Sequence, residues 1–232
     1  MTICNSKPAL GGDSEGLVYD EYKIVDESTA RDSARQVESL FVYLRNNYDL
    51  DGIVTMLMRQ AKRQGIQTYL AIVRRGSEVA GFTVFNTCMR GKFKVIYFIF
   101  AAVAPKFRRR GVYGFILRER DLRHRPDFLI GRPHSPFIYD GLRRFCQKIY
   151  PGSSSRFSTE EISLYSSLLA TFVGPSTDYD AKTSVVRNVF PKGDGYEMPE
   201  SKDSRTARYF KRHVTERDAL LVLLDMRGTS RV

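Results

Sequence analysis

Apolar residues recur at helical spacing in the first quarter of the chain. Residues 28–48 carry apolar side chains three or four positions apart, and residues 51–64 repeat the pattern before Gly65. This spacing gathers the apolar residues on one helix face, so it predicts a helix over each range. Thr29-x-x-Asp32 resembles a capping box at the start of the first helix, and weak alternation over 19–25 predicts a strand before it. The apolar positions are Val37, Leu40, Phe41 and Leu44, then Ile53, Met56, Leu57 and Met58.

The period then changes from helical to extended. Residues 68–74, 79–88 and 93–103 are rich in β-branched and aromatic residues, and turns at Arg75-Gly76-Ser77 and Arg90-Gly91 separate them. These features predict three strands joined by hairpins. The third strand is apolar at both parities over residues 93–100, which predicts a central strand buried on both faces.

Helices and strands alternate in the next part of the chain. The pattern predicts a helix over 112–122, a strand over 127–130 and a helix over 135–148. Ser158-Thr159-Glu160-Glu161 is a capping box, and it predicts a further helix that ends at Gly174-Pro175.

The C-terminal part continues in the same manner. Residues 183–190 predict a strand, and 204–213 a short basic helix. The apolar run 219–226 fits a buried strand or a short core helix, and its length of eight residues favours the strand.

The connection between the central strand and the helix at 112 carries the strongest functional signal. Pro105 ends the strand, and a basic turn containing Arg108-Arg109-Arg110, Gly111 and Gly114 leads into the helix. A helix N-terminus offers free amide N–H groups and the positive end of the helix dipole, which together favour a phosphate-bearing ligand. The structural alternatives are a solvated arginine loop, a glycine that only ends the turn at 111, and close helix–sheet packing at 114.

Composition agrees with a folded protein. The chain has 232 residues, 42% of them hydrophobic, and no apolar run approaches the ~20 residues of a membrane span. We expect residues 1–16 to form a poorly ordered tail without a signal peptide, and 17–232 to form one domain with a core over 17–148 and an extension over 149–232. These features predict a cytoplasmic protein with no membrane partner.

Cysteine and histidine usage argues against disulfides and metals. Cys4, Cys88 and Cys146 are far apart and odd in number, which is typical of free thiols in a reducing compartment. His124, His134 and His213 lack metal-ligand spacing to cysteines or carboxylates, so no metal site is predicted.

Positive charge is concentrated in one stretch. The formal net charge is +11, and residues 106–125 hold eight basic and two acidic residues, a net +6. This indicates an anionic ligand or a nucleic acid partner, and the position of the charges on the glycine turn favours a phosphate ligand over RNA.

The order of elements and the glycine turn together resemble the GNAT N-acetyltransferase superfamily. Val103-x-Pro105 followed by Arg108-x-x-Gly111-x-Tyr113 matches that superfamily's acyl-CoA signature except at its last position, where Tyr113 replaces a small residue and Gly114 follows. A tyrosine there must point away from the pyrophosphate or narrow its site. The segments 185–187 and 218–222 also resemble a little-characterised GNAT-like group with a long C-terminal segment.

This resemblance implies an α/β (α+β) fold, with a mixed, mostly antiparallel central sheet flanked by helices and helical insertions in the C-terminal part. It implies direct transfer of an acyl group, most simply from acetyl-CoA, to an amine of a small molecule or protein in a ternary complex. The backbone around Ala102–Ala104 is expected to pair with the pantetheine arm and polarise the thioester carbonyl. The implied cofactor-binding residues are Ala102, Val103, Ala104, Arg108, Arg109, Arg110, Gly111, Val112, Tyr113 and Gly114.

The catalytic residues of the superfamily are less evident in this chain. The central strand has no Glu to act as base, and Leu142 occupies the position of the usual tyrosine acid. Tyr139, one turn earlier, and His134 are the candidate catalytic residues, although each also fits a structural role as a half-buried helix residue or a loop residue. The missing groups keep two alternatives open, namely an inactive GNAT-shaped binding or regulatory module and an RNA-directed acetyltransferase or binding protein.

Overall fold

The computed structural model describes residues 16–44, 48–146, 148–152, 157–173, 178–190, 201 and 203–228. The expected tail at 1–16 therefore lies outside the described residues except for Gly16. Contacts divide the chain into two compact units, Met1–Cys88 with Phe98–Arg125 (unit 1) and Met89–Tyr97 with Pro126–Val232 (unit 2). Strand β4 (Phe93–Val103) contributes to both units, and the single domain with a core over 17–148 stays a prediction.

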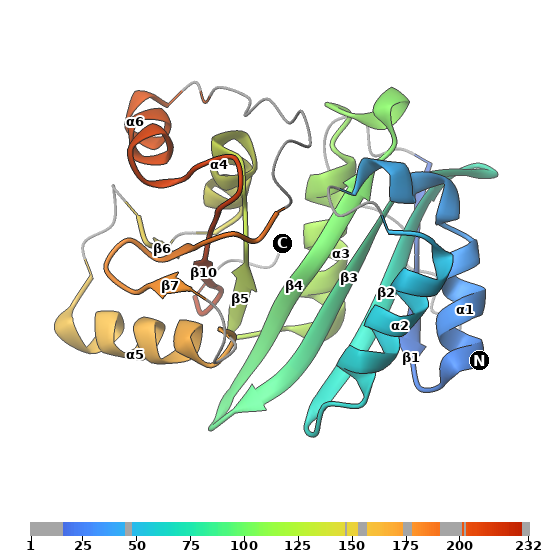
Figure 1. Ribbon diagram of the computed structural model, residues 1–232, viewed down its shortest axis with the longest axis horizontal. Helices are drawn as coiled ribbons and strands as arrows, with labels where there is room; N and C mark the ends of the chain where they lie inside the picture. The colour runs from blue at the N-terminus through green and yellow to red at the C-terminus, as the bar shows by residue number, and fades with distance from the viewer. Residues whose placement is uncertain are drawn as a thin grey trace. The chain divides into compact units, whose positions relative to one another are not determined.

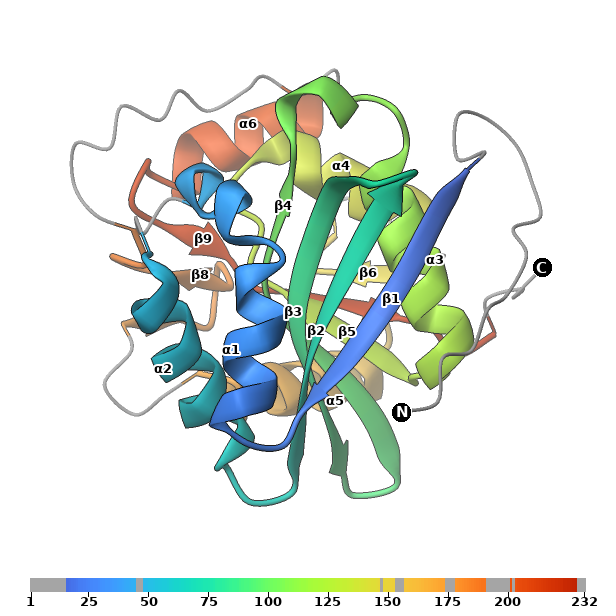
Figure 2. The same ribbon diagram turned by 90° about the vertical axis from the view of Figure 1, so that its right-hand side faces the viewer.

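Unit 1 is built on an antiparallel sheet. Strands β1 (Leu17–Ile24), β2 (Ile66–Arg75) and β3 (Glu78–Arg90) pair in sequence, with Tyr19 opposite Val73 and Leu70 opposite Val84. Helices α1 (Glu27–Arg35) and α2 (Leu50–Ala61) cover one face, and α3 (Val112–His124) covers the other (Figures 1 and 2). The hairpins predicted over 68–103 are confirmed.

The long helix predicted over 28–48 is wrong in length. Helix α1 begins after Asp26, whose Oδ1 accepts the Thr29 N–H at 2.7 Å, so Asp26 is the cap and not Thr29. The chain continues as a 3-10 helix over Glu38–Tyr43, in which the Leu40 N–H donates to the Val37 oxygen. The 3-10 helix still places Leu40 and Phe41 in the core, so hydrophobic spacing alone does not separate the two helix types.

Unit 2 contains the parallel part of the sheet. The first half of β4 pairs in parallel with β5 (Phe128–Gly131), with Val95 opposite Phe128. Strand β10 (Val222–Asp225) lies antiparallel between β5 and β6 (Lys148–Tyr150). The protein therefore has a mixed, mostly antiparallel sheet with flanking helices, as expected from the sequence.

The apolar run 219–226 forms two strands. Strand β9 (Ala219–Leu220) joins β7 (Tyr179–Asp180) and β8 (Val185–Val186) in a three-stranded sheet, whereas β10 belongs to the larger one. Leu221 lies between them, and its N–H donates to the Ser184 oxygen at 2.7 Å. The strand predicted over 183–190 is only two residues long because the chain takes a positive φ on both sides, at Ser184 (53°) and Asn188 (55°).

Three helices complete unit 2, namely α4 (Pro136–Phe145), α5 (Thr159–Ala170) and α6 (Ser204–His213). The predicted capping box of α5 is confirmed, since Ser158 Oγ accepts the Glu161 N–H and the Glu161 carboxylate accepts the Ser158 N–H. Helix α4 is shorter than predicted because residues 148–150 form β6. Among the described residues, no helix is long and apolar enough to cross a membrane.

Candidate functional site

The connection between β4 and α3 lies entirely in unit 1. The chain leaves β4 at Val103 and makes one 3-10 turn over Pro105–Phe107, closed by the Phe107 N–H donating to the Ala104 oxygen at 2.9 Å. It then passes through two left-handed residues, Arg109 (φ 62°) and Gly111 (φ 76°), before α3 begins. The first bond of the helix runs from the Phe115 N–H to the Gly111 oxygen at 2.9 Å.

This backbone path leaves a series of amide N–H groups without acceptors. Within the described part of the chain, no hydrogen-bond acceptor meets the N–H groups of residues 109–114, and no side chain caps α3. Residues 108–111 are exposed to solvent. Successive free amides at a helix start, with the positive end of the dipole behind them, form a binding surface for an anion.

Both glycines of the turn leave space next to this surface. A Cβ built at Gly111 or at Gly114 meets no heavy atom within 4 Å. Gly111 is needed for its left-handed conformation, which other residues adopt at a cost. Gly114 has no positive φ and packs against nothing, so the alternative that it allows close helix–sheet packing is wrong.

Tyr113 does not narrow the loop. Its ring packs toward Phe98 of β4, with 6.4 Å between the ring centroids. Burial raises the pKa of its phenol to about 12, although the positive charge of Arg120 acts to lower it. Of the two outcomes expected for a tyrosine here, the structure has the one in which the ring points away from the free amides.

The basic side chains around the loop differ in their partners. Lys106 forms an ion pair with Glu78, and the Arg108 Nε donates to the Val103 oxygen at 3.3 Å, with the guanidinium 5.3 Å from the Tyr43 ring centroid. No acidic side chain among the described residues pairs with any of the three arginines 108–110. All three keep their positive charge available to a ligand.

The strand end offers fewer groups than expected. The Ala104 N–H donates to the Ala80 oxygen of β3 at 3.0 Å, so this amide is not free to pair with a pantetheine arm or polarise a thioester carbonyl. The Ala102 oxygen also faces β3, where it would lie 2.8 Å from a Cβ at Gly81. Since neighbouring residues of a strand turn their backbone groups to opposite sides, Val103 is the residue of this group that faces away from β3.

Tyr139 and His134 lie in unit 2, whereas all ten predicted cofactor-binding residues lie in unit 1. The Tyr139 hydroxyl donates to the Pro151 oxygen at 2.7 Å, and burial raises its pKa well above the ordinary value of a tyrosine. His134 is half-buried at the start of α4, with its ring 5.2 Å from that of Phe190. The catalytic role of both residues stays a prediction.

The two described cysteines, Cys88 and Cys146, do not form a reactive centre. Cys88 is buried, and burial raises the pKa of the Cys146 thiol to about 12, with a further contribution from the charge of Asp225. A thiol with such a pKa is protonated at neutral pH and is a poor nucleophile. Cys4 lies outside the described residues. In the ranges that the structure describes, no group of three His, Cys, Asp or Glu side chains is placed to hold a metal ion.

The sequence reasoning missed one unusual residue, Arg120 of α3. It is fully buried, its guanidinium carbon lies 3.5 Å from the centroid of the Phe98 ring, and its three side-chain nitrogens have no hydrogen-bond partner. Burial lowers the pKa of the Arg120 guanidinium to about 10, although nearby negative groups act in the opposite direction. A signal was present, because Arg120 follows the core residues Val112 and Ile116 at a spacing of four.

No family model and no curated protein matches the chain. Solved structures of GNAT acetyltransferases do match it. A GNAT family acetyltransferase from Elizabethkingia anophelis, solved with acetyl-CoA bound, is 12% identical with a TM-score of 0.39, over 91% of this chain and 99% of that one. An aminoglycoside acetyltransferase from an uncultured soil metagenomic sample, in complex with sisomicin, is 12% identical with a TM-score of 0.44, over 62% and 94%.

A third similar structure is the ribosomal-protein-alanine N-acetyltransferase from Brucella melitensis biovar Abortus 2308. It is 12% identical with a TM-score of 0.39, over 61% of this chain and 95% of that one. The expected resemblance to the GNAT superfamily is thus found among solved structures, and it is a likeness of fold that does not establish an activity.

Proposed function

We propose that this chain is an acyl-CoA-dependent N-acyltransferase that transfers an acetyl group from acetyl-CoA to the amine of a small molecule or protein. The observation that supports it most is the run of free amides over residues 109–114 at the start of α3, beside three arginines without ion-pair partners. This arrangement fits the diphosphate of coenzyme A, because amide N–H groups and guanidinium groups are the donors that bind phosphate oxygens most strongly.

In the proposed reaction the amine nitrogen attacks the carbonyl carbon of the thioester. A C–N bond forms and the C–S bond breaks, while the nitrogen loses a proton and the departing sulfur gains one. The chain's part is to hold the cofactor through residues 108–114, with Val103 as the strand-end residue that offers its backbone to the pantetheine arm. Alignment of the two substrates then supplies much of the rate enhancement. Tyr139 and His134 stay the predicted proton carriers.

Gly114 allows a sharp test of cofactor binding. It is the third residue of α3 and has open space at its Cβ, so Gly114→Asp places a carboxylate beside the free amides without a steric clash. An acidic residue in the first turn also favours the helix, so the fold is retained. We expect acetyl-CoA to raise the melting temperature of the wild type and of Gly114→Asn, and to leave Gly114→Asp unchanged, because only the aspartate repels the diphosphate.

Two results would count against this proposal. One is a wild type whose melting temperature does not respond to acetyl-CoA or to longer acyl-CoAs at millimolar concentration. The other is equal loss of binding in Gly114→Asn and Gly114→Asp, which would mean that bulk at this position, and not negative charge near a diphosphate, prevents binding. Circular dichroism of both variants establishes that they fold.

A second candidate function is a GNAT-shaped binding or regulatory module without catalysis. Two observations favour it, the absence of a Glu from β4 and the Tyr139 hydroxyl whose proton is donated to the Pro151 oxygen. Release of free thiol from acetyl-CoA in the presence of a panel of primary amines separates the two candidates. Tight binding of acetyl-CoA with no amine-dependent thiol release supports the module.

A further inference from the structure

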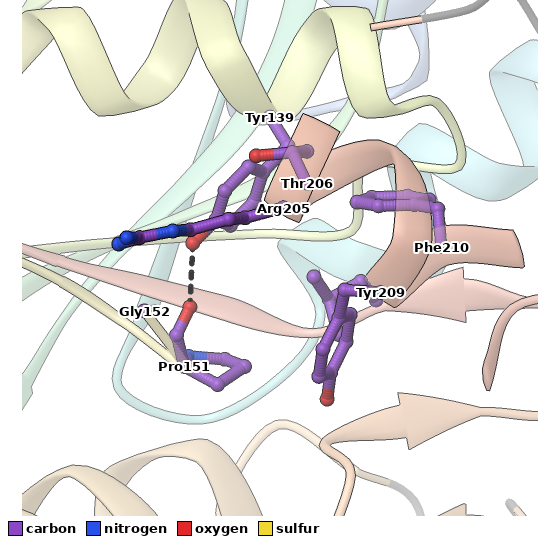
Figure 3. A pocket seen from close by; sticks show the side chains of 8 residues that line it. Tyr139, Pro151, Gly152, Arg205, Thr206, Tyr209 and Phe210 are labelled. Carbon is purple, nitrogen blue, oxygen red and sulfur yellow. Dashed lines mark hydrogen bonds between the residues drawn. The ribbon is translucent and has the colours of Figure 1, made fainter. Parts of the chain in front are cut away.

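Unit 2 contains a small pocket of its own, between α4, the segment after β6, α6 and β9 (Figure 3). Its volume is about 130 Å³. Figure 3 shows Arg205, Tyr139 and Pro151 toward one side of this space and Tyr209 and Phe210 toward the other. The lining residues are Tyr139, Pro151, Gly152, Arg205, Thr206, Tyr209, Phe210 and Leu220.

Three of the eight residues that line the pocket are aromatic. The Tyr139 and Phe210 rings meet edge to face with centroids 6.0 Å apart, and the Tyr209 ring is held by its hydroxyl, which donates to the Thr183 oxygen at 2.6 Å. An apolar cavity of roughly 150 Å³ is large enough for one benzene molecule. At about 130 Å³ this pocket is slightly smaller and holds one aromatic ring at most, which stacks favourably against aromatic side chains.

One buried polar group in the wall has no protein partner. Thr206 is 3% exposed, lines the pocket, and its Oγ1 has no hydrogen-bond partner. Because this oxygen has almost no accessible surface, it offers no contact to a ligand in the pocket. The Tyr139 oxygen donates its own proton to Pro151 and keeps acceptor capacity toward a ligand.

The charge at the mouth of the pocket is positive. Arg205 is exposed, and no carboxylate among the described residues pairs with its side chain. The nearest acidic residue in the sequence, Asp203, is already engaged, since its Oδ2 lies 2.8 Å from Arg143 and its Oδ1 accepts the Arg205 and Thr206 N–H groups. A planar guanidinium without a partner fits a carboxylate with two parallel hydrogen bonds.

From these features we propose that the pocket binds a small carboxylate with one aromatic ring. The ring lies against Tyr139, Tyr209 and Phe210, and the carboxylate pairs with Arg205. The site consists of unit 2 residues alone and does not require acyl-CoA to be bound, although one of its walls is Tyr139, a predicted proton carrier of the proposed reaction.

Benzoate is the probe for this proposal, and benzamide and acetate are its controls. Benzamide has the same ring without the charge, and acetate has the charge without the ring. Isothermal titration calorimetry of the full chain without acyl-CoA is expected to show benzoate binding, with benzamide and acetate at least about tenfold weaker, because each lacks one of the two complementary features.

Arg205→Gln locates the binding, and Arg212→Gln is its control. Arg205→Gln should weaken benzoate about tenfold, whereas Arg212→Gln, the same change on the same helix outside the pocket lining, should bind as the wild type does. Thr206→Val keeps the shape of the side chain and changes no atom that a ligand reaches, so it should fold normally and bind benzoate as the wild type does.

The proposal is overturned if benzoate does not bind the wild type at millimolar concentration, or if benzamide binds equally well. Equal losses in Arg205→Gln and Arg212→Gln would also overturn it, because they would show a general attraction to a basic helix instead of a site at Arg205. Acetyl-CoA binding, measured separately on the same proteins, should be unchanged by these variants, so failure here leaves the proposed acyltransferase function standing.

Discussion

Arg120 carries a positive charge in the interior of unit 1 with no hydrogen-bond acceptor at any of its nitrogens. Burial of an ion costs several kcal/mol, whereas a desolvated cation–π contact such as that with Phe98 returns about 2 kcal/mol. We therefore expect Arg120→Met, which fills nearly the same volume without charge, to increase the free energy of unfolding by about 1 kcal/mol or more. Urea unfolding of both proteins at neutral pH measures the difference.

Two further variants define what this result means. Arg120→Lys keeps the charge but loses the planar stack on Phe98, so it should be less stable than the wild type. Arg118→Met changes an exposed arginine of the same helix and should have little effect. If Arg120→Met is instead clearly destabilised, the guanidinium has a stabilising partner and the unfavourable burial inferred here is wrong.

At the residue scale, sequence reasoning identifies the groups of the loop but not their directions. The order of residues from Arg108 to Gly114 predicts a phosphate site; the structure shows free amides in this run, and the role of the run as a binding site stays a prediction. Whether Tyr113 closes the site depends on the space beside Phe98, and whether Ala104 is free depends on the register with Ala80. Both are tertiary facts that no local pattern contains.

Helix α6 provides a prediction at the scale of an element. Asp203 caps its N-terminus, and its pKa is lowered to about 2, mainly by the hydrogen bond from the Thr206 N–H and then by that from Arg143. A lowered pKa in the folded state stabilises the fold fully above the unfolded value near 4, and this stabilisation is lost as the pH falls from about 4 to 2. Asparagine caps a helix as well as aspartate, so Asp203→Asn removes the charge and keeps the cap.

The urea midpoints of wild type and Asp203→Asn, measured from pH 7 to pH 2, test this prediction. We expect the variant to have the lower midpoint at pH 6 and the two curves to meet near pH 2. Asp32→Asn is the control, because its exposed contact with Arg35 at 3.8 Å contributes little at any pH. A difference between wild type and Asp203→Asn that does not change with pH would contradict the role of the Asp203 charge.

Elements were predictable from the sequence where local chemistry decides them. The capping box at Ser158 and the proline, glycine and turn signals around β2, β3 and β4 gave nearly correct elements. The run 219–226 was not resolved, because its division at Leu221 follows from pairing with two different sheets. The short α4 has the same cause, since residues 148–150 are recruited as a strand by β10.

At the scale of the whole molecule, the sequence predicted the kinds of layers but not the division into units. The resemblance to the GNAT superfamily implied the mixed sheet, and the apolar pattern over residues 93–100 predicted the central β4. The boundary of unit 1 at Arg125 lies between α3 and β5, where the basic stretch ends before Pro126, but such a change does not by itself indicate a boundary between units. The pocket of unit 2 was also beyond prediction, because it gathers residues from positions 139 to 220 that share no sequence motif.

The net charge of +11 raises the question of whether phosphate binding is local or a property of the whole surface. Two triple variants with the same net charge, +8, answer it. One replaces Arg108, Arg109 and Arg110 by serine. The other makes the same change at Arg208, Lys211 and Arg212, all of which are exposed on α6. If the loop is the cofactor site, only the first triple should lose acetyl-CoA binding, measured by thermal shift.

RNA binding follows the total number of phosphate contacts and weakens with salt, so both triples should reduce it to a similar extent. Equal loss of acetyl-CoA binding in both triple variants would mean that the cofactor is attracted by the general positive charge. RNA affinity that both triple variants retain at high salt would contradict an electrostatic origin of RNA binding.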